Sequence, residues 1–297
     1  MIDFEGNIEK LYSVMDKCEL CPRNCKVNRN KGQKGFCCAA EKILVASCNV
    51  HTGEEPPISG SRGSGTIFFS NCTLNCIFCQ NYPISQLGNG REISHDDLVD
   101  TMLNLQKRGV HNINFVTPTH YSAHIAKAVY LSRKKGLTIP IVYNCSGYES
   151  VEILKLLEGI IDIYLPDIKY SSDELAFKYS GIKNYVEINR AALKEMKRQV
   201  GDLSVDKNGI AKRGIIIRHL VLPGSIENTK KALDFIAQEL SNNTFVSLMA
   251  QYHSANKSYE FKELSRCLTE KEYEEAVKYL EKIGLENGWI QDLNNEE

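Results

Sequence analysis

The residues best suited to chemistry are three closely spaced cysteines, Cys72, Cys76 and Cys79, which follow a short apolar segment at residues 66–70. Three thiolates this close in sequence can converge on one metal centre if the chain wraps around it, which a loop after a strand allows. Iron–sulfur clusters prefer thiolate ligands, and a [4Fe–4S] cubane takes four. Three protein ligands therefore leave one iron open, as substrate chemistry requires. The spacing predicts a catalytic [4Fe–4S] cluster.

A zinc knuckle and unligated buried cysteines are the alternatives for this triad. A structural zinc site needs a fourth ligand, most naturally from a second Cys or His pair, and no such pair with suitable spacing lies nearby in the sequence. The cluster interpretation is therefore favoured.

A second group of cysteines precedes the triad. Cys18, Cys21 and Cys25 are followed by Cys37, with Cys38 as an alternative fourth ligand. Two interpretations stay open, an auxiliary [4Fe–4S] cluster and a four-thiolate zinc site that stabilises the N-terminal region. Nearby basic residues would offset the negative charge of either site; they are Arg23, Lys26, Arg29, Lys31 and Lys34. The other cysteines, Cys38, Cys48, Cys145 and Cys267, are interpreted as structural, although Cys145 follows a strand and faces the expected site.

Composition places these sites in an ordinary globular protein. The chain has 297 residues, 42% of them hydrophobic, and a net charge of −1 from 36 basic and 37 acidic residues. Overall charge gives no support to nucleic-acid binding, and no apolar run is long enough to span a membrane. The start of the chain lacks the pattern of a signal peptide. We expect a cytoplasmic protein, where clustered cysteines indicate metal or redox chemistry rather than disulfides.

The elements that must position these residues alternate between apolar strands and amphipathic helices. Expected strands are residues 66–70, 113–116, 140–144, 161–165, 214–222 and 245–249, and expected helices begin at Ser94 or cover residues 122–135, 151–157, 173–179, 186–200 and 226–240. Repeated strand–helix units with nearly all-apolar strands predict a parallel sheet covered by helices. Six strands are too few for a closed eight-stranded barrel. The fold class is therefore α/β, a partial (β/α)6 barrel.

Three regions are expected along the chain. Residues 1–60 form an N-terminal Cys-rich segment with a helix at 8–15 and a strand at 43–46, residues 61–256 form the partial barrel, and residues 257–297 form a C-terminal helical extension. The Gly-, Pro- and Ser-rich stretch at 52–65 predicts a loop or linker. Residues 206–209 predict a hairpin turn. Ser94 with Asp97, and Thr269 with Glu272, predict capping boxes at two helix starts.

The Cys-x3-Cys-x2-Cys spacing, with Phe78 just before the last cysteine and a strand before the first, resembles the radical S-adenosylmethionine superfamily. The resemblance implies that Cys72, Cys76 and Cys79 hold a [4Fe–4S] cluster whose open iron binds S-adenosylmethionine. It implies reductive cleavage to methionine and a 5′-deoxyadenosyl radical that abstracts hydrogen from a substrate. It also implies an electron donor such as a flavodoxin or ferredoxin.

Within this superfamily, the chain resembles proteins related to the pyruvate formate-lyase activating enzyme over nearly its whole length. The matching stretches are residues 54–59, 62–66, 79–82, 112–121, 144–147, 165–169 and 218–224. The resemblance implies that Asp167 and Lys169 lie near the methionine carboxylate, that Arg218 approaches the cofactor, and that His253 neighbours its adenosyl part. A cation physically suits that carboxylate.

The chain also departs from the activating enzymes at two strand ends. Thr117, Thr119 and His120 stand where the family has Gly-Gly-Glu, and Asn144 and Ser146 stand where it has Asp-Thr-Asn-Gly. We assign these five residues to the cofactor site, with the Thr119 hydroxyl or backbone carbonyls accepting from the cofactor's ammonium group. These departures affect the expected substrate more than cofactor binding.

Three functions follow from these observations. The first is an activase that places a radical on a glycine of a partner glycyl radical enzyme. The second is a radical enzyme acting on a small molecule or peptide, motivated by the altered strand ends and the additional cysteine site. The third is a non-catalytic iron–sulfur electron carrier or scaffold.

Overall fold

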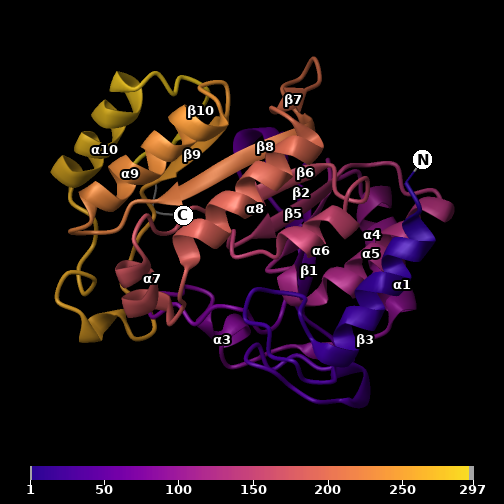
Figure 1. Ribbon diagram of the computed structural model, residues 1–297. Helices are drawn as coiled ribbons and strands as arrows, with labels where there is room; N and C mark the ends of the chain where they lie inside the picture. Colours follow the sequence, from indigo (N-terminus) through magenta and orange to yellow (C-terminus); the bar gives the residue numbers. More distant parts are fainter. Residues whose placement is uncertain (1, 294–297) are drawn as a thin grey trace.

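The computed structural model describes residues 2–293, and its main feature is one large, mostly parallel sheet. The strand order is β10-β9-β8-β6-β5-β4-β2-β1-β3, with the short β7 paired to β8 (Figure 1). The strands are β1 (Ile43–His51), β2 (Ser64–Phe69), β3 (Arg91–Ile93), β4 (Ile113–Val116), β5 (Ile141–Cys145), β6 (Ile163–Pro166), β7 (Ser204–Val205), β8 (Ala211–Leu220), β9 (Phe245–Met249) and β10 (Gly288–Ile290).

The six expected strands correspond to β2, β4, β5, β6, β8 and β9, and each is parallel to the next. This arrangement confirms the α/β fold with a partial barrel. The carboxyl ends of all six strands lie at one end of the sheet, where functional residues of such folds collect. The sheet also gains strands that the sequence did not predict, because β3 pairs with β1 and β10 with β9 over only three residues each.

Helices connect the parallel strands. They are α1 (Phe4–Val14), α2 (Pro56–Ser59), α3 (Tyr82–Ser85), α4 (His95–Lys107), α5 (Ser122–Lys134), α6 (Val151–Leu156), α7 (Asp173–Ser180), α8 (Tyr185–Val200), α9 (Ile226–Phe235) and α10 (Glu270–Lys282). Both expected capping boxes are present, at Ser94 with Asp97 and at Thr269 with Glu272. The hairpin at residues 206–209 is also confirmed, since β7 and β8 pair antiparallel around it.

The expectation of a loop or linker at residues 52–65 is correct only in part. Residues 52–55 and 60–63 lie outside helices and strands, but α2 covers Pro56–Ser59, β2 begins at Ser64, and Glu55, Ile58 and Ser59 are buried as in a domain interior. The reason is a set of distant contacts: Asn112 Nδ2 donates to the Ile58 carbonyl at 2.8 Å, while two prolines start α2. Because β1 pairs with β2, the sheet extends across the expected boundary at residue 60. The three-part division itself stays a prediction, and its residues 1 and 294–297 lie outside the described part.

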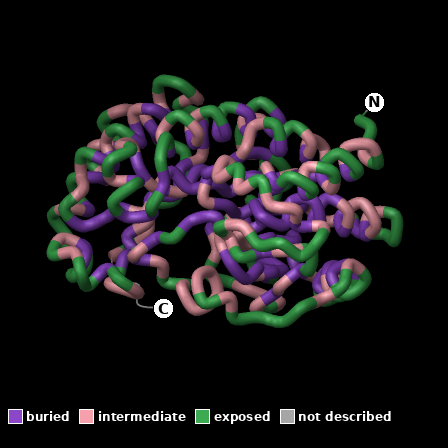
Figure 2. Tube along the Cα trace, turned by 60° about the horizontal axis from the view of Figure 1, so that its bottom comes forward, coloured by how far each residue is buried: buried purple, intermediate pink, exposed green. Residues whose placement is uncertain are grey.

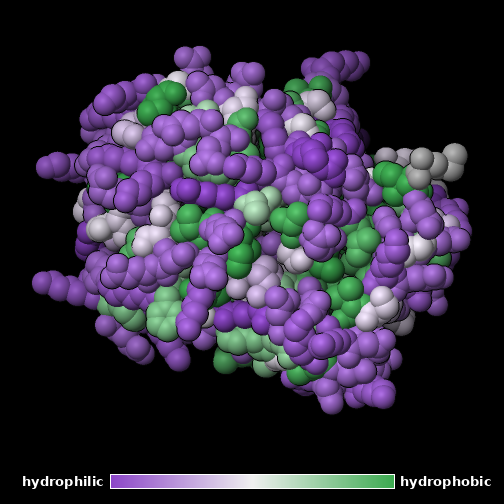
Figure 3. All heavy atoms as spheres, viewed as in Figure 1, coloured by the Kyte–Doolittle hydropathy of each residue, from purple (hydrophilic) through white to green (hydrophobic). Residues whose placement is uncertain are grey.

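Three buried clusters position the site. A large apolar core fills the space between the sheet and helices such as α4, α5 and α8, and a small aliphatic cluster of Val142, Ile163 and Ile216 includes Ile58. A third, tyrosine-rich cluster contains Cys76 and Phe78 of the triad loop. The buried segments run through the middle of the molecule, with exposed loops around them (Figure 2). The face in Figure 3 is largely hydrophilic, with hydrophobic side chains near its middle. None of the described helices is long and apolar enough to cross a membrane.

Candidate active site

The three triad cysteines lie on the loop between β2 and α3 and line a single pocket of about 370 Å³ at the carboxyl ends of the strands. Each sulfur has a polar neighbour: Leu74 N donates to Cys72 Sγ at 3.4 Å, Ser180 Oγ donates to Cys76 Sγ at 2.9 Å, and Cys79 Sγ lies 3.2 Å from Ser85 Oγ. Donors aimed at sulfur stabilise the thiolate form that iron requires.

Burial dominates the electrostatics of the triad. Burial, followed by the neighbouring Cys76 thiol, raises the pKa of Cys72 to about 12, and burial also raises the pKa of Cys76. Without a metal these thiols are neutral, so bound iron would supply the positive charge that ionises them. No three His, Cys, Asp or Glu side chains within residues 2–293 are arranged to hold a single metal ion. A [4Fe–4S] cluster requires a wider arrangement of the sulfurs than a single ion does, because each thiolate binds a different iron.

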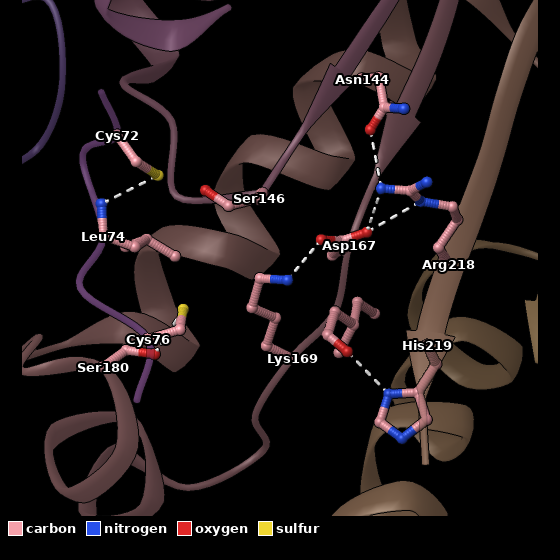
Figure 4. Close-up of polar contacts among 12 residues, drawn as sticks. Cys72, Leu74, Cys76, Asn144, Ser146, Asp167, Lys169, Ser180, Arg218 and His219 are labelled. Carbon is pink, nitrogen blue, oxygen red and sulfur yellow. Dashed lines mark hydrogen bonds and ion pairs between the residues drawn. The ribbon is translucent and has the colours of Figure 1, made fainter. Parts of the chain in front are cut away.

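A chain of charged and polar groups crosses the pocket from the cysteines (Figure 4). Lys169 Nζ lies 2.5 Å from Asp167 Oδ2, Arg218 Nε lies 2.9 Å from Asp167 Oδ1, and Arg218 Nη2 donates to Asn144 Oδ1 at 2.7 Å. The strands bring these residues together, since Asp167 and Arg218 form a parallel bridge just past β6. Asp167, Lys169 and Arg218 thus lie together in the pocket, and their expected roles toward the cofactor stay predictions.

The two cations keep the buried carboxylate ionised. Burial alone would raise the pKa of Asp167, but Arg218 and Lys169 outweigh it, so this pKa lies below its ordinary value. Burial likewise opposes the charge of Lys169, and Asp167 reverses the effect, so the pKa of Lys169 lies above its ordinary value. The ammonium of Lys169 therefore stays charged beside the cysteines, where it can meet a carboxylate of a bound molecule.

The remaining predicted residues divide into two groups. The pocket lining includes Phe78, Thr117, Thr119, Asn144 and Ser146. His120 and His253 are not part of this lining.

Local hydrogen bonds explain both departures. The short helical turn Thr119–Tyr121 directs the imidazole of His120 away from the pocket, and its Nε2 lies 2.9 Å from the carbonyl oxygen of Ser70. His253 is exposed, with Nδ1 3.0 Å from Nε2 of Gln80. Gln80 lines the pocket in its place.

Comparison with known proteins agrees with this geometry. Residues 66–236 match the family described as the Radical SAM superfamily. The chain belongs to the radical SAM superfamily. An uncharacterised protein of Methanocaldococcus jannaschii is 32% identical to it over 96% of this chain and 80% of the relative. A second uncharacterised protein of that organism is 26% identical over 56% of this chain and 53% of the relative.

Solved structures show the same fold. Methylornithine synthase superposes with a TM-score of 0.51 at 14% identity, covering 79% of this chain and 72% of the synthase. The FeFe-hydrogenase maturase HydG of Carboxydothermus hydrogenoformans gives a TM-score of 0.54 at 13% identity, covering 76% of this chain and 52% of the maturase. This likeness concerns the fold alone. Membership in the radical SAM superfamily implies an enzyme that uses a [4Fe–4S] cluster and S-adenosylmethionine.

The radical SAM pocket also contains a carboxyl that the sequence analysis missed. Glu54 lines the pocket, and burial, followed by the neighbouring Glu55, raises its pKa to about 7. Glu54 and Glu55 lie in a segment that was interpreted as a loop. Only their place in the stretch at residues 54–59, which resembles the activating enzymes, pointed to a role in the site.

A second missed carboxyl lies behind the radical SAM pocket. Glu149 is buried, and it accepts hydrogen bonds from Thr119 Oγ1 at 2.7 Å and from the Tyr143 hydroxyl at 3.3 Å. Burial raises its pKa to about 8. Because the Thr119 hydroxyl donates to Glu149, its oxygen lone pairs are free to accept from a ligand in the pocket.

The N-terminal cysteines of this radical SAM protein also converge. Cys18, Cys21, Cys25 and Cys37 line one small cavity, which His120 and Gly35 also line. A Cβ on Gly35 would come within 2.9 Å of Cys25 Sγ, so the backbone closely approaches the thiols. Phe36 N donates to Cys25 Sγ at 3.3 Å.

The structure distinguishes the two candidates for the fourth thiol. Cys37 lines the cavity, whereas Cys38 is exposed and has a left-handed backbone conformation, with φ of 56°. Cys38 Sγ instead contacts the carbonyl oxygen of Phe36. The geometry therefore favours Cys37.

Proposed function

We propose that this protein reductively cleaves S-adenosylmethionine and abstracts a hydrogen atom from a substrate held in the same pocket. The observation that carries the proposal is that the three cysteines and the Lys169–Asp167–Arg218 chain line one pocket. When bound, the reduced cluster supplies the electron that splits the sulfonium into methionine and the 5′-deoxyadenosyl radical. The protein's own residues bind and orient S-adenosylmethionine and the substrate, and they exclude water from the pocket.

Specific roles follow from the positions of the side chains. The ammonium of Lys169 pairs with the methionine carboxylate, while Asp167 fixes its direction. The Thr119 hydroxyl and the backbone near Thr117 accept from the cofactor's ammonium. Thr117 has φ of 59°, which is costly for a β-branched residue by about 1–3 kcal/mol and is the kind of strain that functional sites retain.

The test is cleavage itself. The protein is reconstituted with iron and sulfide without oxygen, reduced with dithionite and mixed with S-adenosylmethionine, and 5′-deoxyadenosine is measured. Stoichiometric or catalytic release supports the proposal. An intact reduced cluster without release overturns it and favours a non-catalytic electron carrier or scaffold.

A glycine of a glycyl radical enzyme is the first candidate substrate. It is supported by the near full-length resemblance to activating enzymes and by the Asp167-x-Lys169 pattern at the pocket. Mixing the reduced protein with each glycyl radical enzyme of the host should produce a glycyl radical doublet in the EPR spectrum of one of them. No doublet with any of them rules this substrate out.

A small molecule or peptide is the second candidate substrate, favoured by the buried carboxyl of Glu54 in the pocket. Hydrogen abstraction from a backbone glycine does not require a carboxyl group in the pocket. Consumption of a metabolite or peptide coupled to 5′-deoxyadenosine release supports this candidate, and release with no such consumption counts against it.

We also propose a flavodoxin or ferredoxin as electron donor, because the cluster must receive its electron from outside the chain. A reduced flavodoxin or ferredoxin should replace dithionite in the cleavage assay. If neither supports cleavage while dithionite does, the donor is of another kind.

The four N-terminal cysteines are proposed to hold a second metal centre, either a [4Fe–4S] cluster or zinc, and zinc would require the thiols to move closer together around the single ion. The shared cavity and the unpartnered, buried Nδ1 of His120 beside it support this proposal. Metal analysis distinguishes the outcomes: about eight irons per chain indicate two clusters, and about four irons with one zinc indicate a zinc site. Four irons with no other metal would overturn the proposal.

A further inference from the structure

The carboxyl of Glu54 enters the barrel from the end opposite the cysteines, and the adjacent Glu55 is buried. Strand β1 is antiparallel to β2, and His51 at its end pairs with Ser64 at the start of β2. The chain that follows therefore turns at the amino ends of the parallel strands. From there Glu54 reaches the pocket whose other end holds the triad, and it forms the floor of that pocket.

Glu54 has weak contacts there. Asn144 Nδ2 lies 3.5 Å from its Oε2, and His51 Nδ1 lies 3.6 Å from its Oε1, both at or beyond the limit of a normal hydrogen bond. Only 7% of its side chain is exposed, so the carboxyl is largely withdrawn from bulk water. A buried carboxyl with such long contacts can accept stronger hydrogen bonds from a ligand.

Neighbouring groups are also unpartnered. Asn114 is fully buried, and neither its Oδ1 nor its Nδ2 has a hydrogen-bond partner. Glu55 is 7% exposed, and its Oε2 also has none. Buried polar atoms without partners are rare in folded proteins, and each one calls for a specific structural or functional reason.

The sheet register aims Asn114 at this floor. Side chains alternate along a strand, so Asn114 points to the same side as Val116, two residues later in β4. Val116 and its strand partner Asn144 line the pocket. Asn114 is close enough to Glu54 to act as a long hydrogen-bond donor, which lowers the pKa of this carboxyl, although burial raises it more.

The charged groups around the pocket favour the binding of a positively charged ligand. Lys169 and Arg218 both bind Asp167, and Arg218 is the cation that acts on Glu54. Two further carboxyls, Glu54 and Glu55, lie near Arg218, and the imidazole of His51 lies 3.6 Å from Glu54 Oε1. An ammonium group has three donors and no acceptor, and Glu54, Glu55 and Asn114 Oδ1 offer three acceptors.

We propose that the Glu54–Glu55–Asn114 floor binds a protonated primary amine of the substrate. This inference rests on the proposed function, in which a substrate occupies the pocket. The amine would fix the substrate at the floor, with its reacting C–H bond toward the cysteine end. The floor would thus select amines over alcohols and carboxylates of the same shape.

Butylammonium is a suitable probe because it carries the proposed group alone. Its affinity for the reconstituted, oxidised protein with S-adenosylmethionine present is measured by saturation-transfer NMR, beside 1-butanol and butyrate. We expect butylammonium to bind at least about 10-fold more tightly than 1-butanol, as one charge-assisted hydrogen bond can provide. Equal binding of the two overturns the proposal, as does displacement of butylammonium by equimolar K⁺.

The variant Glu54→Gln with Glu55→Gln should lose this preference, while Glu152→Gln, at an exposed pair with Lys155, should keep it. A preference that survives the double substitution overturns the proposal. If the double variant fails to fold, the pH dependence of binding to the unsubstituted protein tests the proposal instead. We expect the affinity for butylammonium to rise several-fold from pH 6 to pH 8. An affinity that does not change with pH contradicts the inference. The assay requires no turnover, so it can fail or succeed independently of S-adenosylmethionine cleavage.

Discussion

Arg23, two residues after Cys21, donates a hydrogen bond from Nε to the carbonyl oxygen of Thr73, 3.0 Å away, in the residue that follows Cys72. The two cysteine motifs, separated along the chain, are therefore joined by one side chain. Arg23 Nη1 also donates to the carbonyl of Gly181 at 2.9 Å. On the other side of Cys72, His120 lies against the Ser70 carbonyl and in turn accepts from Arg29 through its own carbonyl oxygen at 2.6 Å.

Replacing Arg23 should therefore disturb the triad loop. We expect Arg23→Gln to lose both carbonyl contacts and about 2 kcal/mol of the free energy of unfolding. Release of 5′-deoxyadenosine should fall several-fold, because the loop holds the cluster less firmly. The exposed Arg91→Gln is the control and should behave as the unsubstituted protein does. Equal activity of the two variants would show that the contact does not matter.

Removal of one triad ligand should abolish cleavage. Cys76→Ala leaves two thiolates, too few to hold the cubane in the pocket, so 5′-deoxyadenosine should fall to background. Cys267→Ala, at an exposed cysteine outside the pocket, should retain full release. Measurable cleavage by the Cys76 variant, quantified by liquid chromatography, would contradict the assignment of the catalytic cluster.

The neighbouring cysteines Cys37 and Cys38 provide a matched pair of substitutions. Cys37→Ala should lose the metal of the N-terminal site, because Cys37 lines that cavity, whereas Cys38→Ala should retain it. Metal content per chain, measured after gel filtration, separates the two. The reverse pattern would mean that the loop rearranges when metal binds and that Cys38 is the ligand.

Lys169 should contribute to cofactor affinity through its charge. Lys169→Met removes the ammonium but leaves Asp167 paired with Arg218, so the fold of the strand ends should persist. We expect the dissociation constant of S-adenosylmethionine to rise about 10-fold or more. Lys178→Met, at a surface pair with Glu263, is the control. An unchanged constant in equilibrium dialysis would exclude Lys169 from the cofactor site.

The protonation of Glu149 should be visible near neutral pH. Burial favours the neutral acid, and its pKa of about 8 means that the group is protonated at pH 7 and ionises as the pH rises through 8. The folded state then binds a proton that the unfolded chain has already released, so this group destabilises the fold as pH rises from about 4.5 to 8.

Infrared difference spectra of the protein should accordingly show a protonated carboxyl band that disappears between pH 7 and pH 9. Glu149→Gln should lack this band at every pH, while Glu54 accounts for a second band that disappears near pH 7. A spectrum without a Glu149-dependent band at pH 7 would show that the carboxyl is ionised.

Much of the site could be predicted because its residues follow strands. Parallel strands end at one edge of a sheet, so Asp167 after β6 and Arg218 on β8 were expected at the same edge as Cys72 after β2 once the strands were recognised. The regular alternation of apolar strands and capped helices likewise determined the fold class. The missed strands β3 and β10 are too short to show a pattern of their own.

The sequence by itself indicated the cysteine triad, the parallel sheet and the polar strand ends, because these depend on local spacing and on periodicity. Only the tertiary structure placed Glu54 at the floor of the pocket, turned His120 away from it and distinguished Cys37 from Cys38. Each of these depends on contacts between distant segments, such as the antiparallel pairing of β1 with β2. Such contacts leave no periodic signal in the chain, and their energies are settled only when the segments pack together.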